Sequence, residues 1–362
     1  MMKSFHKLTI IFLLIPTLTF GIGKTNKKRH EKSKKIAKSF TVNSDATLSI
    51  DNKYGDINIT TWAKNTIEID VEITIKGDDV GDVEDQLEKI DIEFNDSPNL
   101  VEAKTIFEKN KSSWSWWGKS KKISYKIIYT VKMPISNNVK LANDYGAISL
   151  SELNGEASIN CDYGKISIGD LRGNNTDINL DYCSTSTINS MKDGNINIDY
   201  SKLTIESATD LKLNADYSSF KLAKATNLDF NIDYGSLVVN EITNTTGNGD
   251  YTALKFGTVK KNLKVKSDYG SIKIENLANG FESVTIDSEY AGIKIGTSAT
   301  NNFSFIIDLQ YAGFKRNNDN VELLKSIVKN SKKYYEGIYG KGNSNSKITI
   351  KSEYGSVTFS EN

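Results

Sequence analysis

Residues 161–170 read CDYGKISIGD, and close variants of this stretch recur along the chain, such as SDYGSIKI and SEYGSVTF. Each copy places an acid, a tyrosine and a small residue before a run of alternating apolar residues. Successive copies are 17 to 21 residues apart, which is the repeat length of a coiled β-solenoid. The repeat tyrosines are Tyr145, Tyr163, Tyr182, Tyr200, Tyr217, Tyr234, Tyr251, Tyr269, Tyr290 and Tyr311, with Tyr54 and Tyr354 further away along the chain.

Apolar and polar residues alternate before each tyrosine, as in Ile196, Ile198 and Tyr200. Strand side chains alternate between two faces, so the tyrosine is predicted to point into the core with the aliphatic residues while the preceding acid points outward. The small residue after the tyrosine lets the backbone turn. The sequence therefore predicts an all-β fold, a parallel β-solenoid with two or three strands in each turn. Parallel crossovers favour a right-handed coil, although repeats of this length also occur in left-handed coils.

Outside the repeats, the chain starts with a lysine-flanked apolar run typical of a secretory signal peptide, followed by a basic stretch. A later segment has Val321, Leu324, Ile327 and Val328 at helical spacing, which predicts a helix that covers the open end of the solenoid. We expect residues 1–21 to be a signal peptide, 22–39 a basic flexible tail, 40–135 a β-rich region continuous with the solenoid, 136–316 the solenoid repeats, 317–340 a helical insertion and 341–362 the final solenoid turn.

Composition excludes several classes of function. Lys and Arg number 46 against 45 Asp and Glu, so no long-range field steers the chain to nucleic acid. The two histidines, His6 and His30, both precede the predicted fold, which therefore lacks an imidazole for catalysis. Cys161 and Cys183 are expected to be unpaired thiols. No later apolar stretch is long enough to span a membrane, so the mature chain is expected to be exported without a transmembrane span.

The acids before the tyrosines form a column that solenoid stacking would space by about 5 Å, which costs about 1 kcal/mol per neighbouring pair in water. In the favoured interpretation each acid accepts backbone N–H bonds at its corner. In the alternative the column is a row of weak Ca²⁺ sites. The candidate residues are Asp144, Asp162, Asp181, Asp199, Asp216, Asp233, Asp250 and Asp268, continued by Glu289 and Glu353 and interrupted by Gln310.

Three tryptophans, Trp114, Trp116 and Trp117, occur in KNKSSWSWWGKSKK between two predicted strands. They either fold back onto the β-layer or stay exposed, where they offer stacking faces for sugars, lipid headgroups or a protein partner. They are the candidate contact loop. The isolated Trp62 is expected to serve packing.

The chain resembles the exported β-strand-repeat family of bacteria labelled "putative adhesin", related to the head GIN domain of "putative" autotransporter adhesins. The matching stretches are FTVNSDATLSIDNKYGDINITTW, YTVKMPISNNVKLANDYGAISL and the repeated YGDINI and YGSIKI strands. The overall pattern is similar to members from the Bacteroidetes. The resemblance implies a β-solenoid at the cell envelope and implies no catalytic motif.

Three functional hypotheses follow. The first is an exported, non-catalytic, adhesin-like module that binds an envelope glycan or a surface protein. The second is a periplasmic structural or envelope-stress protein without an external ligand. The third, a polysaccharide-cleaving enzyme, is disfavoured because the carboxylates form a uniform column and arginine is nearly absent.

Overall fold

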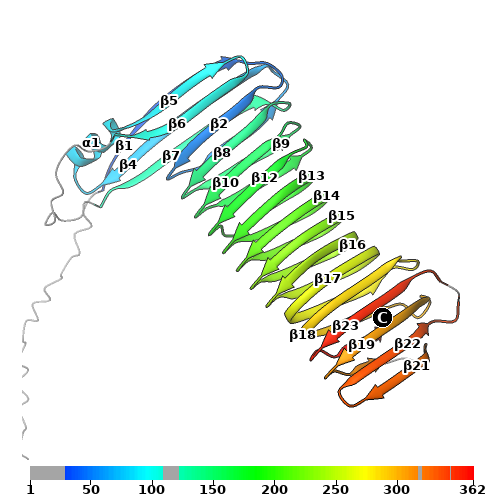
Figure 1. Ribbon diagram of the computed structural model, residues 1–362. Coiled ribbons are helices and arrows are strands. Elements are labelled where there is room, and N and C mark those ends of the chain that lie inside the picture. The colour runs from blue at the N-terminus through cyan, green and yellow to red at the C-terminus, as the bar shows by residue number, and fades with distance from the viewer. Residues whose placement is uncertain (1–28, 109–121, 317–319, 343) are drawn as a thin grey trace, which may run out of the picture.

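The computed structural model describes residues 29–108, 122–316, 320–342 and 344–362. These residues form an elongated stack of β-strands with a broader β-region at the N-terminal end (Figure 1). The all-β fold class and the solenoid are confirmed. Within the described ranges, one α-helix is present, and no helix has the length and apolar character needed to cross a membrane.

Each solenoid turn contains two strands, one before and one after its tyrosine, and these build two facing parallel sheets. Sheet I contains β2, β8, β10 and β12, and sheet II contains β3, β9 and β11. In each of β13 to β16, a single strand runs from sheet II into sheet I and bends between them. Strand β17 does the same and then returns to sheet II, and β18 runs from sheet I into sheet II. The strands are β2 Thr47–Lys53, β3 Ile57–Trp62, β8 Asn138–Asp144, β9 Ala147–Leu153, β10 Ala157–Asp162, β11 Lys165–Leu171, β12 Thr176–Asp181, β13 Ser186–Asp199, β14 Lys202–Asp216, β15 Ser219–Asp233, β16 Ser236–Asp250, β17 Ala253–Leu277 and β18 Ser283–Thr297.

Alternation along these strands builds the core as predicted. Ile196 and Ile198 from sheet I and Leu203 and Ile205 from sheet II are all buried. Pairing is in register, so equivalent residues of successive turns lie beside one another, as with Asp199 opposite Asp216. The apolar columns therefore form one continuous core along the stack.

The prediction that the tyrosines point into this core is wrong. Each repeat tyrosine has a positive φ, for example 48° at Tyr217. This left-handed conformation breaks the alternation at one residue and turns the ring out of the core. The residue after the tyrosine, such as Ser218, faces inward instead.

The N-terminal region extends both sheets. In sheet I, β6 pairs with β2 and carries β5 beside it. In sheet II, β7 pairs with β3 and is followed outward by β4 and β1. A short helix, α1 Val80–Glu88, packs on β1 and β4 and is capped by the Asp79 side chain, which accepts a hydrogen bond from the Asp82 backbone N–H at 3.0 Å. The strands are β1 His30–Thr41, β4 Thr66–Gly77, β5 Ile90–Ser97, β6 Leu100–Phe107 and β7 Ser124–Pro134.

At the other end, the order of the turns in space differs from their order in the sequence. Strand β23 lies between β18 and β19, so the last residues of the chain form the turn before the final one (Figure 1). A hairpin of β21 and β22 adds to β19 and ends sheet I. The strands are β19 Phe303–Gln310, β20 Phe314–Arg316, β21 Val321–Lys329, β22 Lys332–Tyr339, β23 Lys347–Glu353 and β24 Val357–Glu361.

The helix predicted for residues 317–340 is therefore wrong. Asn330 has a φ of 53° and forms the tight turn of the hairpin, where asparagine tolerates this conformation. The register of β21 shifts between Leu323 and Lys325, so one extra residue, Leu324, interrupts the strand alternation. Leu324, Ile327 and Val328 are exposed on the hairpin, so their spacing does not mark the buried face of a helix. The hairpin covers the edge of β19, at the end of the solenoid that the helix was expected to cover.

Candidate functional site

The most regular feature of the surface is a row of stacked tyrosine rings at one corner of the turns, which we name the tyrosine edge. Successive ring centroids lie 4.6 to 5.4 Å apart, and neighbouring planes differ by at most 12°. Tyr54 and Tyr354, which stand apart in the sequence, belong to it. In spatial order the rings are Tyr54, Tyr145, Tyr163, Tyr182, Tyr200, Tyr217, Tyr234, Tyr251, Tyr269, Tyr290, Tyr354 and Tyr311.

The left-handed backbone at these tyrosines costs about 1 to 2 kcal/mol each. At other positive-φ positions among the described residues, the chain uses residues that adopt this conformation more cheaply, namely Asn175, Asn330, Gly280 and Gly340. Ring stacking returns about 0.5 to 1.5 kcal/mol per pair beyond the buried area. The stacking of the tyrosine side chains thus offsets the cost of the left-handed backbone at this corner.

The rings remain about half exposed, from 40% at Tyr54 to 58% at Tyr311. Half of about 200 Å² per side chain, over twelve rings, gives about 1,200 Å² of continuous aromatic surface. Because each ring stacks on its neighbours, the edge presents mainly ring rims and hydroxyl groups to the solvent. Soluble monomers rarely expose connected apolar patches above a few hundred Å².

The acid column runs beside the tyrosine edge on sheet I. From Tyr54 to Tyr251, the backbone N–H of each tyrosine donates to the carbonyl of the acid in the next turn, as from Tyr163 to Asp181 at 2.9 Å. At the C-terminal end, Tyr354 donates to the carbonyl of Gln310 and Tyr311 to that of Ser331. The carboxylate of Asp250 accepts a hydrogen bond from the backbone N–H of Asp268 at 3.2 Å. The sequence favours backbone N–H bonds to these carboxylates within one corner, whereas this bond comes from the next turn. At the first rung the acid is replaced by Lys53, which pairs with Asp144 at 2.8 Å.

Burial and neighbouring carboxylates perturb this column. The pKa values of Asp162, Asp199 and Asp233 are raised, first by burial and then by the acids of the adjacent turns. Among the described residues, no group of three or more acids, histidines or cysteines has the arrangement of a metal site. The geometry therefore gives no support to the calcium hypothesis for this column.

Small residues after the tyrosines are required by close backbone approach. A Cβ placed on Gly164 would lie 1.9 Å from the carbonyl oxygen of Gly146 in the preceding turn. In other turns a short polar side chain fills this position: the Ser218 hydroxyl donates to the carbonyls of Ile198 and Asp216. The corner therefore admits either glycine or a residue whose side chain points inward.

The two cysteines belong to this inner corner structure. Both are buried, and the Cys183 thiol donates to the Cys161 carbonyl at 3.0 Å. The pKa of Cys161 is raised by its hydrogen bond with Cys183 and by burial. A buried thiol with a raised pKa is a poor nucleophile, so Cys161 contributes packing. The hydrogen bond with Cys161 lowers the pKa of Cys183, and the Cys183 side chain is likewise buried.

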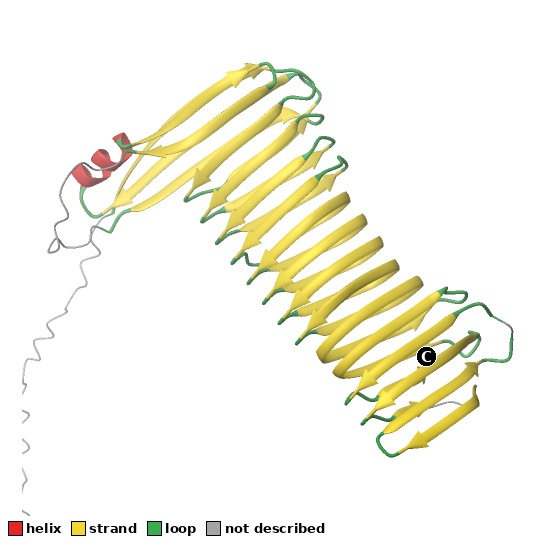
Figure 2. Cartoon of the chain, in the orientation of Figure 1, coloured by secondary structure: helices red, strands yellow, loops and turns green. Residues whose placement is uncertain are grey.

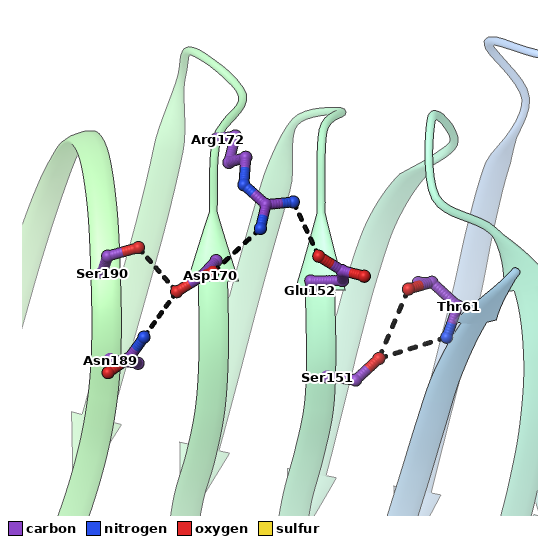
Figure 3. Close-up of polar contacts among 7 residues, drawn as sticks. All are labelled: Thr61, Ser151, Glu152, Asp170, Arg172, Asn189 and Ser190. Carbon is purple, nitrogen blue, oxygen red and sulfur yellow. Dashed lines mark hydrogen bonds and ion pairs between the residues drawn. The ribbon is translucent and has the colours of Figure 1, made fainter.

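A second polar cluster lies on sheet II near the opposite corner (Figure 3). Arg172 bridges Glu152 at 2.7 Å and Asp170 at 2.9 Å. The other carboxylate oxygen of Asp170 accepts from Ser190 at 2.7 Å and Asn189 at 2.6 Å, and these bonds lower the pKa of Asp170. The ion pairs and hydrogen bonds among these side chains connect three neighbouring turns. Because Asp170 is ionised and both of its carboxylate oxygens are hydrogen-bonded, the cluster contains no carboxylate activated as a general base.

The candidate contact loop with Trp114, Trp116 and Trp117 lies outside the described residues. Trp62 is half-buried, and its indole N–H donates to the Thr66 carbonyl at 2.9 Å. The ammonium group of Lys64 lies over its ring at 4.7 Å. These contacts agree with a packing role for Trp62.

No family model and no curated protein matches the chain. Among solved structures it is similar to a "putative adhesin" from Parabacteroides merdae, with 12% identity, 90% of this chain and 96% of that chain covered, and a TM-score of 0.34. A "putative adhesin" from Parabacteroides distasonis has 14% identity, 73% and 92% coverage and a TM-score of 0.31. A "putative cell adhesion protein" from Clostridium sporogenes has 10% identity, 91% and 100% coverage and a TM-score of 0.19. These names agree with the resemblance drawn from the sequence, and at such identities and scores the functional argument rests on the residues of this chain.

Proposed function

We propose that this chain is an adhesin-like, non-catalytic binding protein whose tyrosine edge is its contact surface. The observation that carries this proposal is the continuous row of twelve stacked, half-exposed tyrosines. Its area of about 1,200 Å² exceeds the roughly 800 Å² that each partner buries in a standard protein interface. Tyrosine is also one of the residues enriched at such interfaces.

The chemistry of the edge indicates the class of partner. Ring rims, hydroxyl groups and the adjacent carboxylates offer apolar area together with many hydrogen-bond donors and acceptors. An envelope glycan or a surface protein can use both kinds of contact. The predicted signal peptide supports an exported location, and the tryptophan loop stays a second candidate contact on the basis of its sequence.

A double substitution in the middle of the row tests the proposal. Tyr217→Asn with Tyr234→Asn removes two rings while placing a residue that tolerates the left-handed backbone at each site. We expect at least tenfold weaker adsorption of the purified mature chain to bacterial cells and envelope fractions, since interface aromatic residues commonly contribute more than 1 kcal/mol each. The matched control is Ile327→Asn with Val328→Asn, which removes exposed apolar area from the terminal hairpin.

The alternative is a periplasmic structural protein in which the rings only stabilise the stack. It is supported by the close stacking of each ring on its neighbours. If the tyrosine variant lowers the unfolding temperature but adsorbs like the parent chain, the structural alternative replaces the binding proposal. Reducing ends released from a panel of glycans would instead point to the polysaccharide-cleaving enzyme.

A further inference from the structure

A groove of about 750 Å³ lies on sheet I, at the end of its strands away from the tyrosine edge. It follows the bend between the two sheets, where β13 stops pairing with β11 at Met191 and starts pairing with β12 at Asn195. Its lining extends from Asn175 to Ser283, which spans seven turns. Six intervals of 4.8 to 5.0 Å make it about 29 Å long.

A row of side-chain amides forms one wall of the groove. Asn262 donates to Asn244 at 3.0 Å, Asn244 donates to Asn227 at 3.0 Å, and Asn227 donates to Asp210 at 2.5 Å. Each amide has two N–H donors and two acceptor positions. These contacts use one donor and one acceptor position on Asn227 and on Asn244, so each amide keeps one more of both kinds for a ligand.

Two of the lining residues carry buried hydroxyl groups that lack hydrogen-bond partners among the described residues. They belong to Thr176, which is 1% exposed, and Thr245, which is 5% exposed. A buried polar group without a partner costs about 1 to 3 kcal/mol. The equivalent position in other turns holds Leu211, Leu228 and Leu263, so these threonines place polar atoms where the core pattern favours leucine.

The charges of the lining nearly cancel. The lining contains two lysines, Lys212 and Lys264, and three aspartates, Asp193, Asp210 and Asp229, and its other polar residues are Asn, Thr and Ser. This near balance gives no field that would favour a polyanion or a polycation. A neutral polyhydroxylated chain suits such a lining, because every sugar offers donors and acceptors to amides and hydroxyls.

We propose that this groove binds an extended, neutral, β-linked oligosaccharide of about six sugars along the axis of the stack. One hexose of such a chain advances by nearly the spacing of one solenoid turn, so consecutive sugars meet equivalent amides of consecutive turns. The site lies at the other end of the sheet I strands from the tyrosine edge. The inference therefore does not depend on the contact proposed for that edge.

The test uses the full mature chain and neutral β-1,4-linked oligosaccharides of glucose, mannose and N-acetylglucosamine, two to eight units long, in titration calorimetry. For at least one series, affinity is expected to rise with length up to about six units. Asn244→Ser is expected to weaken binding at least fivefold. Its matched control is Asn179→Ser, because Asn179 occupies a similar amide row outside the groove, donating to Asn160 at 2.7 Å and accepting from Asn197 at 2.8 Å.

A second pair of variants separates binding from folding. Thr246→Leu adds bulk at the exposed rim of the groove, and Thr285→Leu makes the same change at the equivalent position beyond its lining. Only the first is expected to weaken binding, with both chains unfolding at similar temperatures. The proposal is overturned if no neutral series binds, if Asn244→Ser and Thr246→Leu bind like the parent, or if polygalacturonate binds as well as the neutral chains. Loss of oligosaccharide binding in the Tyr217→Asn, Tyr234→Asn variant would also overturn it, by moving the sugar site to the tyrosine edge.

Discussion

The two corners of each solenoid turn follow different rules. At the tyrosine corner, every turn has the same left-handed tyrosine, with a φ between 48° and 63°, followed by a residue of small size. At the opposite corner, some turns have loops, such as the one around Gly280, and others carry a single strand through the bend, as β14 does (Figure 2). The variation in repeat length from 17 to 21 residues is absorbed at the opposite corner.

This difference shows where the structure tolerates change. At the tyrosine corner, ring stacking requires a tyrosine in every turn, and close backbone approach requires a small residue after it. At the opposite corner, side-chain hydrogen bonds between turns, such as the row from Asn262 to Asp210, add to the backbone pairing, and several polar residues can make them. A long, uniform contact surface and a more variable, ligand-selective groove can therefore coexist on one stack.

The largest expected effect comes from a methyl group at the tyrosine corner. Gly164→Ala should lower the free energy of unfolding by about 3 kcal/mol or more, because the new Cβ meets the Gly146 carbonyl oxygen and the backbone has to move. Gly292→Ala is the matched control, since a Cβ there has nothing within 4 Å. Chemical denaturation checks both variants, and equal stabilities would contradict the role of close approach.

Removal of a single ring should have the next largest effect. Tyr217→Asn loses two stacking contacts and the buried half of the ring but relieves backbone strain, for a net loss of about 1 to 3 kcal/mol. Tyr217→Phe keeps the stack and should change stability by less than about 0.5 kcal/mol. If Tyr217→Asn unfolds like the parent chain, stacking does not hold this corner together.

Cysteine at the inner corner should be replaceable by serine. Cys183→Ser is expected to change stability by less than about 1 kcal/mol, because Ser201 and Ser218 make the same kind of carbonyl bonds in the following turns. Cys161→Ser should cost more, since it places a hydroxyl where the next turn has the buried Leu180. The unfolding temperatures of the two variants provide the measurement. A lower unfolding temperature for Cys183→Ser than for Cys161→Ser would contradict the proposed roles.

The smallest expected effects are those of pH on the stability of the fold, and they have opposite signs for Asp199 at the tyrosine corner and Asp170 near the opposite corner. The raised pKa of Asp199 means that its ionised form destabilises the fold at neutral pH, and this penalty disappears as the pH falls through the raised value. The lowered pKa of Asp170 means that its ionised form stabilises the fold at neutral pH, and this contribution is lost as the pH falls through the lowered value. At pH 7, Asp199→Asn should therefore be slightly stabilising and Asp170→Asn destabilising, each by less than about 1 kcal/mol after solvent screening.

Unfolding temperatures of these two aspartate variants between pH 3 and pH 7 provide the measurement. The advantage of Asp199→Asn over the parent should vanish in acid, where the parent residue is protonated. A stabilising effect of Asp170→Asn at pH 7 would contradict the assigned hydrogen bonds.

Much of the fold could be predicted because each turn carries the same local pattern. The spacing of the tyrosines and the alternation around Ile196 and Ile198 predict in-register parallel strands. The outward turn of the tyrosines was missed because a single left-handed residue reverses the alternation without changing the spacing. The acid before the ring and the small residue after it are the signals of that corner.

The C-terminal arrangement could not be predicted from local pattern. The stretch SEYGSVTF around Tyr354 predicts a solenoid turn but not its neighbours, and Tyr354 stacks between Tyr290 and Tyr311. For the candidate sites, the acids and tyrosines were identified by residue, and the acids were correctly expected to point outward, but the exposure of the tyrosines was not predicted. The groove was missed, although Asn227, Asn244 and Asn262 each precede a tyrosine by seven residues, a regularity that the sequence contains.

Tyrosine nitration by tetranitromethane, read by mass spectrometry on the mature chain free and adsorbed to bacterial envelope fractions, tests the central claim most directly. The tyrosine edge is predicted to react in the free chain and to be protected on adsorption, at least from Tyr182 to Tyr269, while Tyr334 on the terminal hairpin keeps its reactivity. Equal nitration of the tyrosine edge in both states would contradict its role as the contact surface.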